Sequence, residues 1–130
     1  MGVVHHSNYI KFFEEGRVHW LRDRGMIGVH KPDGPYTFAV VALDCQFLKT
    51  VRFDDPIEVW VQGRMEGIKI HFRYAVLNGR TGAWAATGHT DLVPLNDEHK
   101  PSRLPVSVRE IFADQAWESA WPPERAAETR

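Results

Sequence analysis

The sequence is poor in cysteine, in long apolar runs and in charge of one sign. Its only cysteine is Cys45, so no disulfide can form within the chain, and a cytoplasmic setting is expected. No stretch approaches the roughly 20 apolar residues of a membrane span, and the N-terminus lacks the apolar core of a signal peptide. With 16 basic and 17 acidic side chains, the net charge gives no reason to expect nucleic acid or an anionic membrane as a partner.

Residues that ligate metals or act as nucleophiles are also sparsely placed. His5 and His6 are adjacent and therefore diverge, and the other histidines are scattered, so the sequence predicts no metal site and no cofactor. Cys45 lies in the apolar run 38–47, where a buried structural thiol is favoured over a nucleophile.

What the sequence does contain is the pattern of one globular domain with a single core, starting with a helix over residues 7–26. Ser7 or Asn8 can cap the first turn, and Gly25 can end the helix, before a Gly- and Pro-rich loop over 28–35. The predicted core face of this helix carries Tyr9, Phe12, Phe13, Gly16 and Trp20.

Strand patterns follow the helix, and together they predict an α+β protein with an antiparallel sheet. The first strand opens with a nearly continuous apolar run, which is typical of a strand covered on both faces. The second and third alternate, and the fourth is rich in small residues that allow close packing against it. The expected strands are 37–49, 57–65, 68–77 and 83–95, followed by a helix over 106–117 and a frayed tail over 118–130.

The run from Gly2 to Arg17, GVVHHSNYIKFFEEGR, resembles the signature of the 4-hydroxybenzoyl-CoA thioesterase family of hotdog proteins. Its nearest branch by resemblance is that of the bacterial acyl-CoA thioesterases encoded with the Tol-Pal envelope genes. Two later segments support the likeness, which spans residues 2–105: 53–59 resembles the entry into a central strand, and 88–105 resembles the final strand and the following loop.

The resemblance implies one hotdog domain over 1–130, in which a curved antiparallel sheet wraps a long helix and residues 105–130 form a C-terminal helix and tail. It also implies a homodimer or homotetramer with active sites at the subunit interface. The family pattern includes a strand before the motif that this chain lacks, so either the true start codon lies upstream or the domain tolerates an open sheet edge. Because a long exposed edge is prone to aggregation, we expect the first.

By resemblance, the activity is hydrolysis of an acyl-CoA at the N-terminus of the first helix. The backbone N–H of His6 would face the thioester oxygen, and its imidazole would assist. The family's catalytic aspartate stands seven positions before this residue, which is before Met1, so we expect the 130-residue chain to be weakly active or inactive. The alternative is a hotdog protein that binds acyl-CoA or a partner protein without catalysis.

Two other carboxylates have competing interpretations. Glu14 is either a catalytic group, as helix glutamates are in related hotdog lineages, or a structural partner of Arg17 one turn on. Asp44, within an apolar strand, either lines the active site or forms a hydrogen bond at the dimer interface. The candidate substrate-binding residues are Val4, His5, Asn8 and Tyr9 at the helix start, and Lys49, Arg52 and Arg103 as contacts for CoA phosphates or as ordinary solvated charges.

Overall fold

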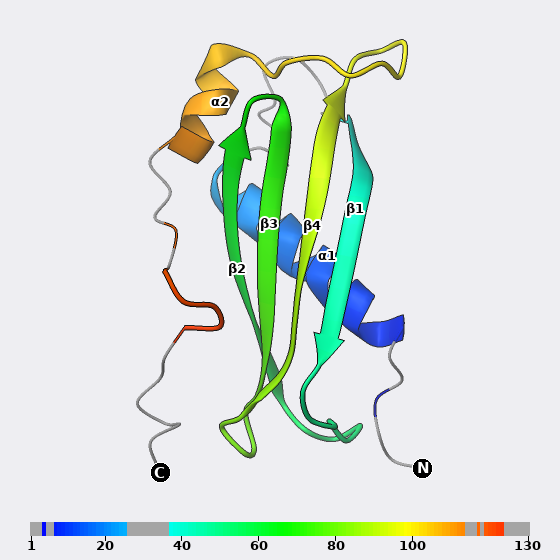
Figure 1. Cartoon of the computed structure of the whole chain (residues 1–130), viewed down its shortest axis with the longest axis vertical. Helices are drawn as coiled ribbons and strands as arrows, with labels where there is room; N and C mark the ends of the chain where they lie inside the picture. Colours follow the sequence, from blue (N-terminus) through cyan, green and yellow to red (C-terminus); the bar gives the residue numbers. More distant parts are fainter. Residues whose placement is uncertain (1–3, 5–6, 26–36, 114–116, 118, 124–130) are drawn as a thin grey trace.

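The computed structural model describes residues 4, 7–25, 37–113, 117 and 119–123 of the chain. The strands form one antiparallel sheet in the order β1-β4-β3-β2, as expected for an α+β protein. Figure 1 shows α1 crossing one face of this sheet and α2 beside one end of β2. The elements are α1 (Ser7–Asp23), β1 (Thr37–Phe47), β2 (Ile57–Glu66), β3 (Lys69–Asn78), β4 (Trp84–Leu95) and α2 (Val106–Ala113).

The first helix packs on β2 and β3 through one apolar face. Gly16 allows this contact, because a Cβ at that position would lie only 2.8 Å from Cγ2 of Val61 and 2.9 Å from Cγ1 of Val59. The helix is followed by Gly25, whose φ of 78° suits glycine at a helix C-terminus. The predicted helix and most of its core face are confirmed, and its buried side chains are Tyr9, Phe13, Trp20 and Leu21.

The hairpin of β2 and β3 forms as the alternating pattern predicts. Its register runs from the pair Ile57 and Asn78 to the pair Glu66 and Lys69. Gly67 takes a φ of 61° in the turn between the strands. The apolar side chains of β3 that the sequence assigns to the core are all almost fully buried: Ile70, Phe72, Tyr74 and Val76.

Small residues in β4 let the helix approach the sheet closely. A Cβ on Gly88 would lie 2.5 Å from Cε2 of Phe13 and 2.6 Å from the backbone oxygen of Asp44. Ala85 and Ala86 beside it are buried. The expectation that something packs tightly on this strand is therefore confirmed, and the Phe13 ring is what packs there.

The expectation that β1 is covered on both faces is wrong for the single chain. This strand pairs with β4 on one side only, and a register shift between Val40 and Ala42 marks a bulge. Within the described residues, Phe38 and Cys45 pack against the core and the Phe47 ring meets Tyr9 of α1, but several apolar side chains of β1 remain largely exposed. The exposed fractions are 48% for Val40, 53% for Val41, 44% for Leu43 and 54% for Phe47.

The C-terminal segment also differs from its prediction. The second helix is described over Val106–Ala113, residues 114–116 of the predicted helix lie outside the described residues, and Trp117 is not helical. The guanidinium carbon of Arg73 lies 4.0 Å from the Trp117 ring centroid and 4.5 Å from that of Trp121. The Trp121 indole N–H donates to the backbone oxygen of Tyr74 at 2.8 Å. This part of the expected frayed tail is thus anchored on the sheet.

Two predictions concern other parts of the chain. The loop expected over 28–35 lies outside the described residues. None of the helices in the described ranges is long and apolar enough to cross a membrane.

Candidate active site

The candidate site is the start of α1, where the chain is tied to the connection between β1 and β2. The backbone N–H of Val4 donates to the carbonyl oxygen of Val51 at 2.6 Å, and α1 begins three residues later at Ser7. Val51 is only 1% exposed, so this connection is anchored in the core. The first N–H groups of a helix lack partners within it, and together with the helix dipole they favour negative charge. The predicted site residues His5 and His6 lie outside the described residues.

Tyr9 forms the inner wall beside this helix start. Its ring meets Phe47 edge-on at 5.2 Å and Phe12 at 5.7 Å between centroids. Burial raises the pKa of Tyr9, with a smaller contribution from Cys45, so the phenol stays protonated at neutral pH. Burial likewise raises the pKa of Cys45, with the Asp44 charge adding to the effect. A raised thiol pKa disfavours the nucleophilic thiolate, in keeping with a structural role for this cysteine.

An exposed apolar surface adjoins Tyr9. Phe47, at the end of β1, is 54% exposed although it touches the Tyr9 ring. The connection that follows β1 carries Leu48, 49% exposed, and Phe53, 71% exposed. Single exposed apolar residues are normal, whereas several of them in one connection are typical of a binding surface.

The other side of the same connection forms a cavity of about 400 Å³, which we call the first basic cavity. Lys49 and Arg52 come from the segment between β1 and β2, and Arg80 comes from the loop between β3 and β4. The structure thus brings the two predicted cations together and adds a third that the sequence did not single out. The full lining is Lys49, Thr50, Arg52, Asn78, Arg80, Thr81 and Ala83.

The buried side chain of Asp55 holds residues of this cavity in place through hydrogen bonds. Its side chain is 1% exposed and accepts from Arg80 Nε at 2.5 Å, from Asn78 Nδ2 at 2.8 Å and from the backbone N–H of Arg52 at 3.0 Å. The Arg80 side chain, followed by the Arg52 backbone N–H, holds the pKa of Asp55 far below its ordinary value. The carboxylate is therefore charged at neutral pH and fixes three of the cavity-lining residues, Arg52, Asn78 and Arg80.

Arg103, predicted alongside Lys49 and Arg52, lies elsewhere. It lines a second basic cavity of about 510 Å³ with Arg64 and Arg109, near the turn between β2 and β3. The first basic cavity borders the opposite end of β3, and a strand of ten residues spans about 30 Å. The three predicted phosphate contacts therefore belong to two separate cavities, and only the first adjoins the helix start.

The two candidate carboxylates are not brought to the helix start within the chain. Asp44 is 53% exposed in the single chain, and its Oδ2 contacts Nδ1 of His89. It faces away from α1, because its neighbour Cys45 pairs with Gly88, which faces Phe13, and adjacent strand residues point to opposite faces.

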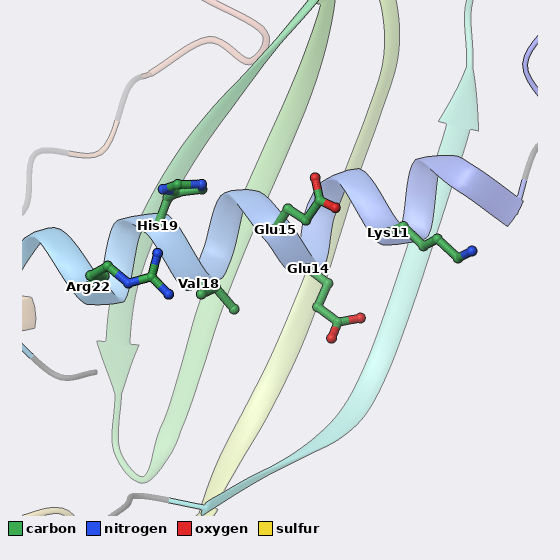
Figure 2. Close-up of a pocket in the computed structure, with 6 residues that line it drawn as sticks. All are labelled: Lys11, Glu14, Glu15, Val18, His19 and Arg22. Carbon is green, nitrogen blue, oxygen red and sulfur yellow. The ribbon is translucent and has the colours of Figure 1, made fainter. Parts of the chain in front are cut away.

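Glu14 lies on the exposed side of α1. Figure 2 shows Glu14 and Glu15 pointing to opposite sides of the helix, within an open hollow that also involves His19. Arg17, the partner that the sequence suggested for Glu14, donates from Nη1 to the Tyr74 hydroxyl at 3.2 Å.

Two histidine–aspartate pairs on the outer sheet face were not predicted from the sequence. His71 on β3 contacts Asp91 on β4 at 2.6 Å between Nδ1 and Oδ1, and His89 on β4 pairs with Asp44 on β1. Each pair occupies directly opposed positions in the register. Only the register, which the sequence did not fix, could have found them. Within the described ranges, no three His, Cys, Asp or Glu side chains are grouped to hold a metal ion.

The fold and the helix start together define the class. Residues 1–112 match the family described as the Thioesterase-like superfamily, and the chain belongs to this family. Its helix on an antiparallel sheet is the hotdog domain that the resemblance implied. The finer assignment to the Tol-Pal-associated branch stays a prediction.

Three proteins that are similar to this chain carry the names of esterases or thioesterases. The "Probable Thioesterase from Bartonella henselae" has a solved structure that superposes with a TM-score of 0.66 and 30% identity, covering 80% of this chain and 84% of that one. The "Putative acyl-CoA thioesterase YneP" of Bacillus subtilis is 24% identical over 125 residues, covering 93% of this chain and 84% of that protein. The "Putative esterase" of Aquifex aeolicus is 36% identical over 58 residues, which is 45% of each chain and thus less than half of that relative.

Proposed function

We propose that this protein is an acyl-CoA thioesterase, which hydrolyses the thioester to a carboxylic acid and free CoA. The observation that carries the proposal is the position of the α1 start, between an apolar surface at Phe47 and the first basic cavity at Lys49. An acyl-CoA matches this arrangement. Its acyl end is apolar, its phosphates are anionic, and its thioester lies between them. Membership in the Thioesterase-like superfamily and the name of the Bacillus relative support the same reaction class.

In the proposed reaction, water attacks the thioester carbonyl carbon and loses a proton to a base. The carbonyl oxygen becomes negative in the transition state, and the N–H groups at the positive end of the α1 dipole, with that of His6, stabilise it. The carbon–sulfur bond then breaks, and the CoA thiolate takes up a proton. No carboxylate that could act as this base lies among the described residues of the helix start, which are Val4 and residues 7–9. Glu14 from a partner protomer remains a candidate for this role.

The proposed assembly is a homodimer, or a tetramer built from such dimers, joined through β1. This strand is an edge with one unpaired side and exposes Val41, Leu43 and Phe47. Long apolar edges are aggregation-prone unless they are covered, and a second copy of the same strand is complementary to it. Pairing there would also place a second protomer beside Phe47 and the α1 start.

The activity is tested by release of free thiol from a panel of aromatic, short-chain and long-chain acyl-CoAs. His6→Pro removes the backbone N–H while His6→Ala keeps it, so the matched pair isolates the oxyanion donor. We expect a loss of about 10²- to 10³-fold in kcat for the proline variant relative to the alanine variant. Equal rates for the two would remove the oxyanion role of this position.

The assay also separates the rival function. A protein that binds acyl-CoA but releases no thiol from any member of the panel, even when the family's preceding strand and aspartate are added, would be a ligand-binding hotdog protein. A full turnover rate by the 130-residue chain would instead contradict the need for the missing aspartate.

A further inference from the structure

We propose that the first basic cavity is the site that binds the phosphate groups of CoA, with Lys49, Arg52 and Arg80 as its cationic contacts. This inference rests on the proposed function and deepens it, because it places the anionic end of the substrate on named residues. It also gives a role to Arg80, which the sequence did not single out.

Charge is the first argument for the site. Three cations line a cavity of about 400 Å³, and none of the residues that line it is a carboxylate. Lys49 and Arg52 are exposed, and neither forms an ion pair with any residue in the described part of the chain. Converging cations with accessible side chains are what a phosphate group requires.

Preorganisation is the second argument. Asp55 accepts two hydrogen bonds from the Arg80 guanidinium. A guanidinium has five N–H groups, so three N–H groups of Arg80 do not bond to Asp55. The Arg80 side chain is 51% exposed, so it remains accessible although it is anchored. A guanidinium that is already held in place loses less side-chain freedom when it binds an anion.

The loop that carries Arg80 is itself fixed. The backbone N–H of Arg80 donates to Asn78 Oδ1 at 2.9 Å, and the backbone N–H of Gly79 donates to the Pro56 carbonyl oxygen at 2.7 Å. Gly82 closes the loop with a φ of 74° and a bond from its N–H to the Asn78 oxygen at 2.8 Å. The cavity wall is therefore formed before any ligand arrives.

Position is the third argument. Thr50 and Arg52, which line the cavity, flank Val51, the residue whose oxygen accepts the bond from Val4. The three-residue step from Val4 to Ser7 spans at most about 11 Å. A short segment of chain therefore separates the cavity from the helix start. In an acyl-CoA, the pantetheine group likewise separates the phosphates from the thioester. The second basic cavity is at the other end of β3 and does not adjoin this helix start.

The test is a set of calorimetric titrations with CoA, dephospho-CoA and pantetheine into the full chain. Lys49→Gln and Arg52→Gln remove exposed charges that no core contact depends on, and the double variant combines them. Arg103→Gln is the matched control, because it removes an exposed cation from the second basic cavity. Thermal unfolding of each variant confirms that the fold is kept.

The site predicts that each substitution at Lys49 or Arg52 weakens CoA binding about tenfold, with pantetheine binding unchanged. Arg103→Gln should leave CoA binding unchanged. Dephospho-CoA shows which phosphate occupies the cavity. If it is the 3′-phosphate, the wild type binds dephospho-CoA more weakly than CoA, and the variants bind the two ligands equally well. If it is the diphosphate, the variants bind both ligands more weakly than the wild type does.

The site is wrong if the double variant keeps the affinity of the wild type for CoA, if Arg103→Gln alone loses it, or if the wild type binds CoA no better than pantetheine. These outcomes are independent of turnover. A chain that binds CoA through Lys49 and Arg52 but releases no thiol would keep the site and remove the proposed hydrolysis.

Discussion

Asp55 shows how one side chain can hold a loop, a strand entry and a basic cavity together. It is the common acceptor for Arg80, Asn78 and the backbone N–H of Arg52, and it is almost fully buried. Because these donors stabilise the charged form, they lower the pKa of Asp55 in the folded state relative to the unfolded state. The structural contribution of this residue therefore depends on pH.

We predict that Asp55→Asn lowers the free energy of unfolding at neutral pH and flattens its acid dependence. A depressed folded pKa means that the contribution of Asp55 is fully present above its ordinary pKa of 3.8 and diminishes as the pH falls below that value. Urea unfolding of the wild type and the variant between pH 7 and pH 2 measures this difference. Asp54→Asn is the control for a neighbouring exposed carboxylate. Parallel pH profiles for wild type and Asp55→Asn would contradict the prediction.

Gly88 is the second residue whose identity the structure explains. It sits on β4 directly under the Phe13 ring, and its missing side chain is what lets α1 lie on the sheet.

We predict that Gly88→Ala costs about 1–3 kcal/mol in the free energy of unfolding, because the new methyl group overpacks the contact. The clash involves Phe13 and also the backbone oxygen of Asp44, which cannot move as a side chain can. Thermal or urea unfolding measures the loss. Phe13→Leu in the Gly88→Ala background should recover only part of it, and a fully stable Gly88→Ala protein would show that the helix can shift without cost.

At the scale of the elements, a buried polar network joins α1 to the sheet within the apolar core. The Tyr74 hydroxyl bonds Thr90 Oγ1 at 2.6 Å and accepts from Arg17 at 3.2 Å, while its ring stacks on Phe13 at 4.6 Å between centroids. Burial raises the pKa of Tyr74, so the phenol is neutral and can serve as a hydrogen-bond donor. Each of the three elements α1, β3 and β4 thus supplies one partner.

We predict that Tyr74→Phe destabilises the protein by about 1–2 kcal/mol, because it leaves the buried Thr90 hydroxyl without this partner. The double variant Tyr74→Phe with Thr90→Val removes both polar groups and should be closer to the wild type than the sum of the single changes. A double-mutant cycle of unfolding free energies gives the coupling between the two residues. A coupling of zero would mean that the hydrogen bond adds nothing to stability.

At the scale of the whole molecule, β1 is an edge strand that pairs with β4 on one side only. Four of its apolar side chains, Val40, Val41, Leu43 and Phe47, are about half exposed, although their sequence is that of a buried strand. A second copy of the chain, joined edge to edge at β1, would resolve this difference between the sequence pattern and the single chain.

We predict that Leu43→Asp weakens self-association about 100-fold or more, because a buried unpaired charge costs about 3–5 kcal/mol. Val106→Asp is the matched control, since it places the same charge on a 60% exposed apolar residue at the start of α2, away from β1. Sedimentation of both variants over a range of concentrations measures the effect. A wild type that sediments as a monomer, or a Leu43→Asp variant that still dimerises, would exclude this interface.

The sequence by itself determined the elements, because their signals are local. The helical spacing of Tyr9, Phe13 and Trp20 and the alternation along β2 and β3 each depend on neighbours within a few residues, and both are confirmed. The run from Gly2 to Arg17 likewise indicated the family to which the chain belongs.

Only the tertiary structure decided which distant residues meet. It joined Lys49 and Arg52 to Arg80, moved Arg103 to another cavity and paired Asp44 with His89 on the outer face, because strand order and register set these neighbours. It also left β1 as an open edge, since an apolar run records that a strand is covered but not whether its own chain or another copy covers it.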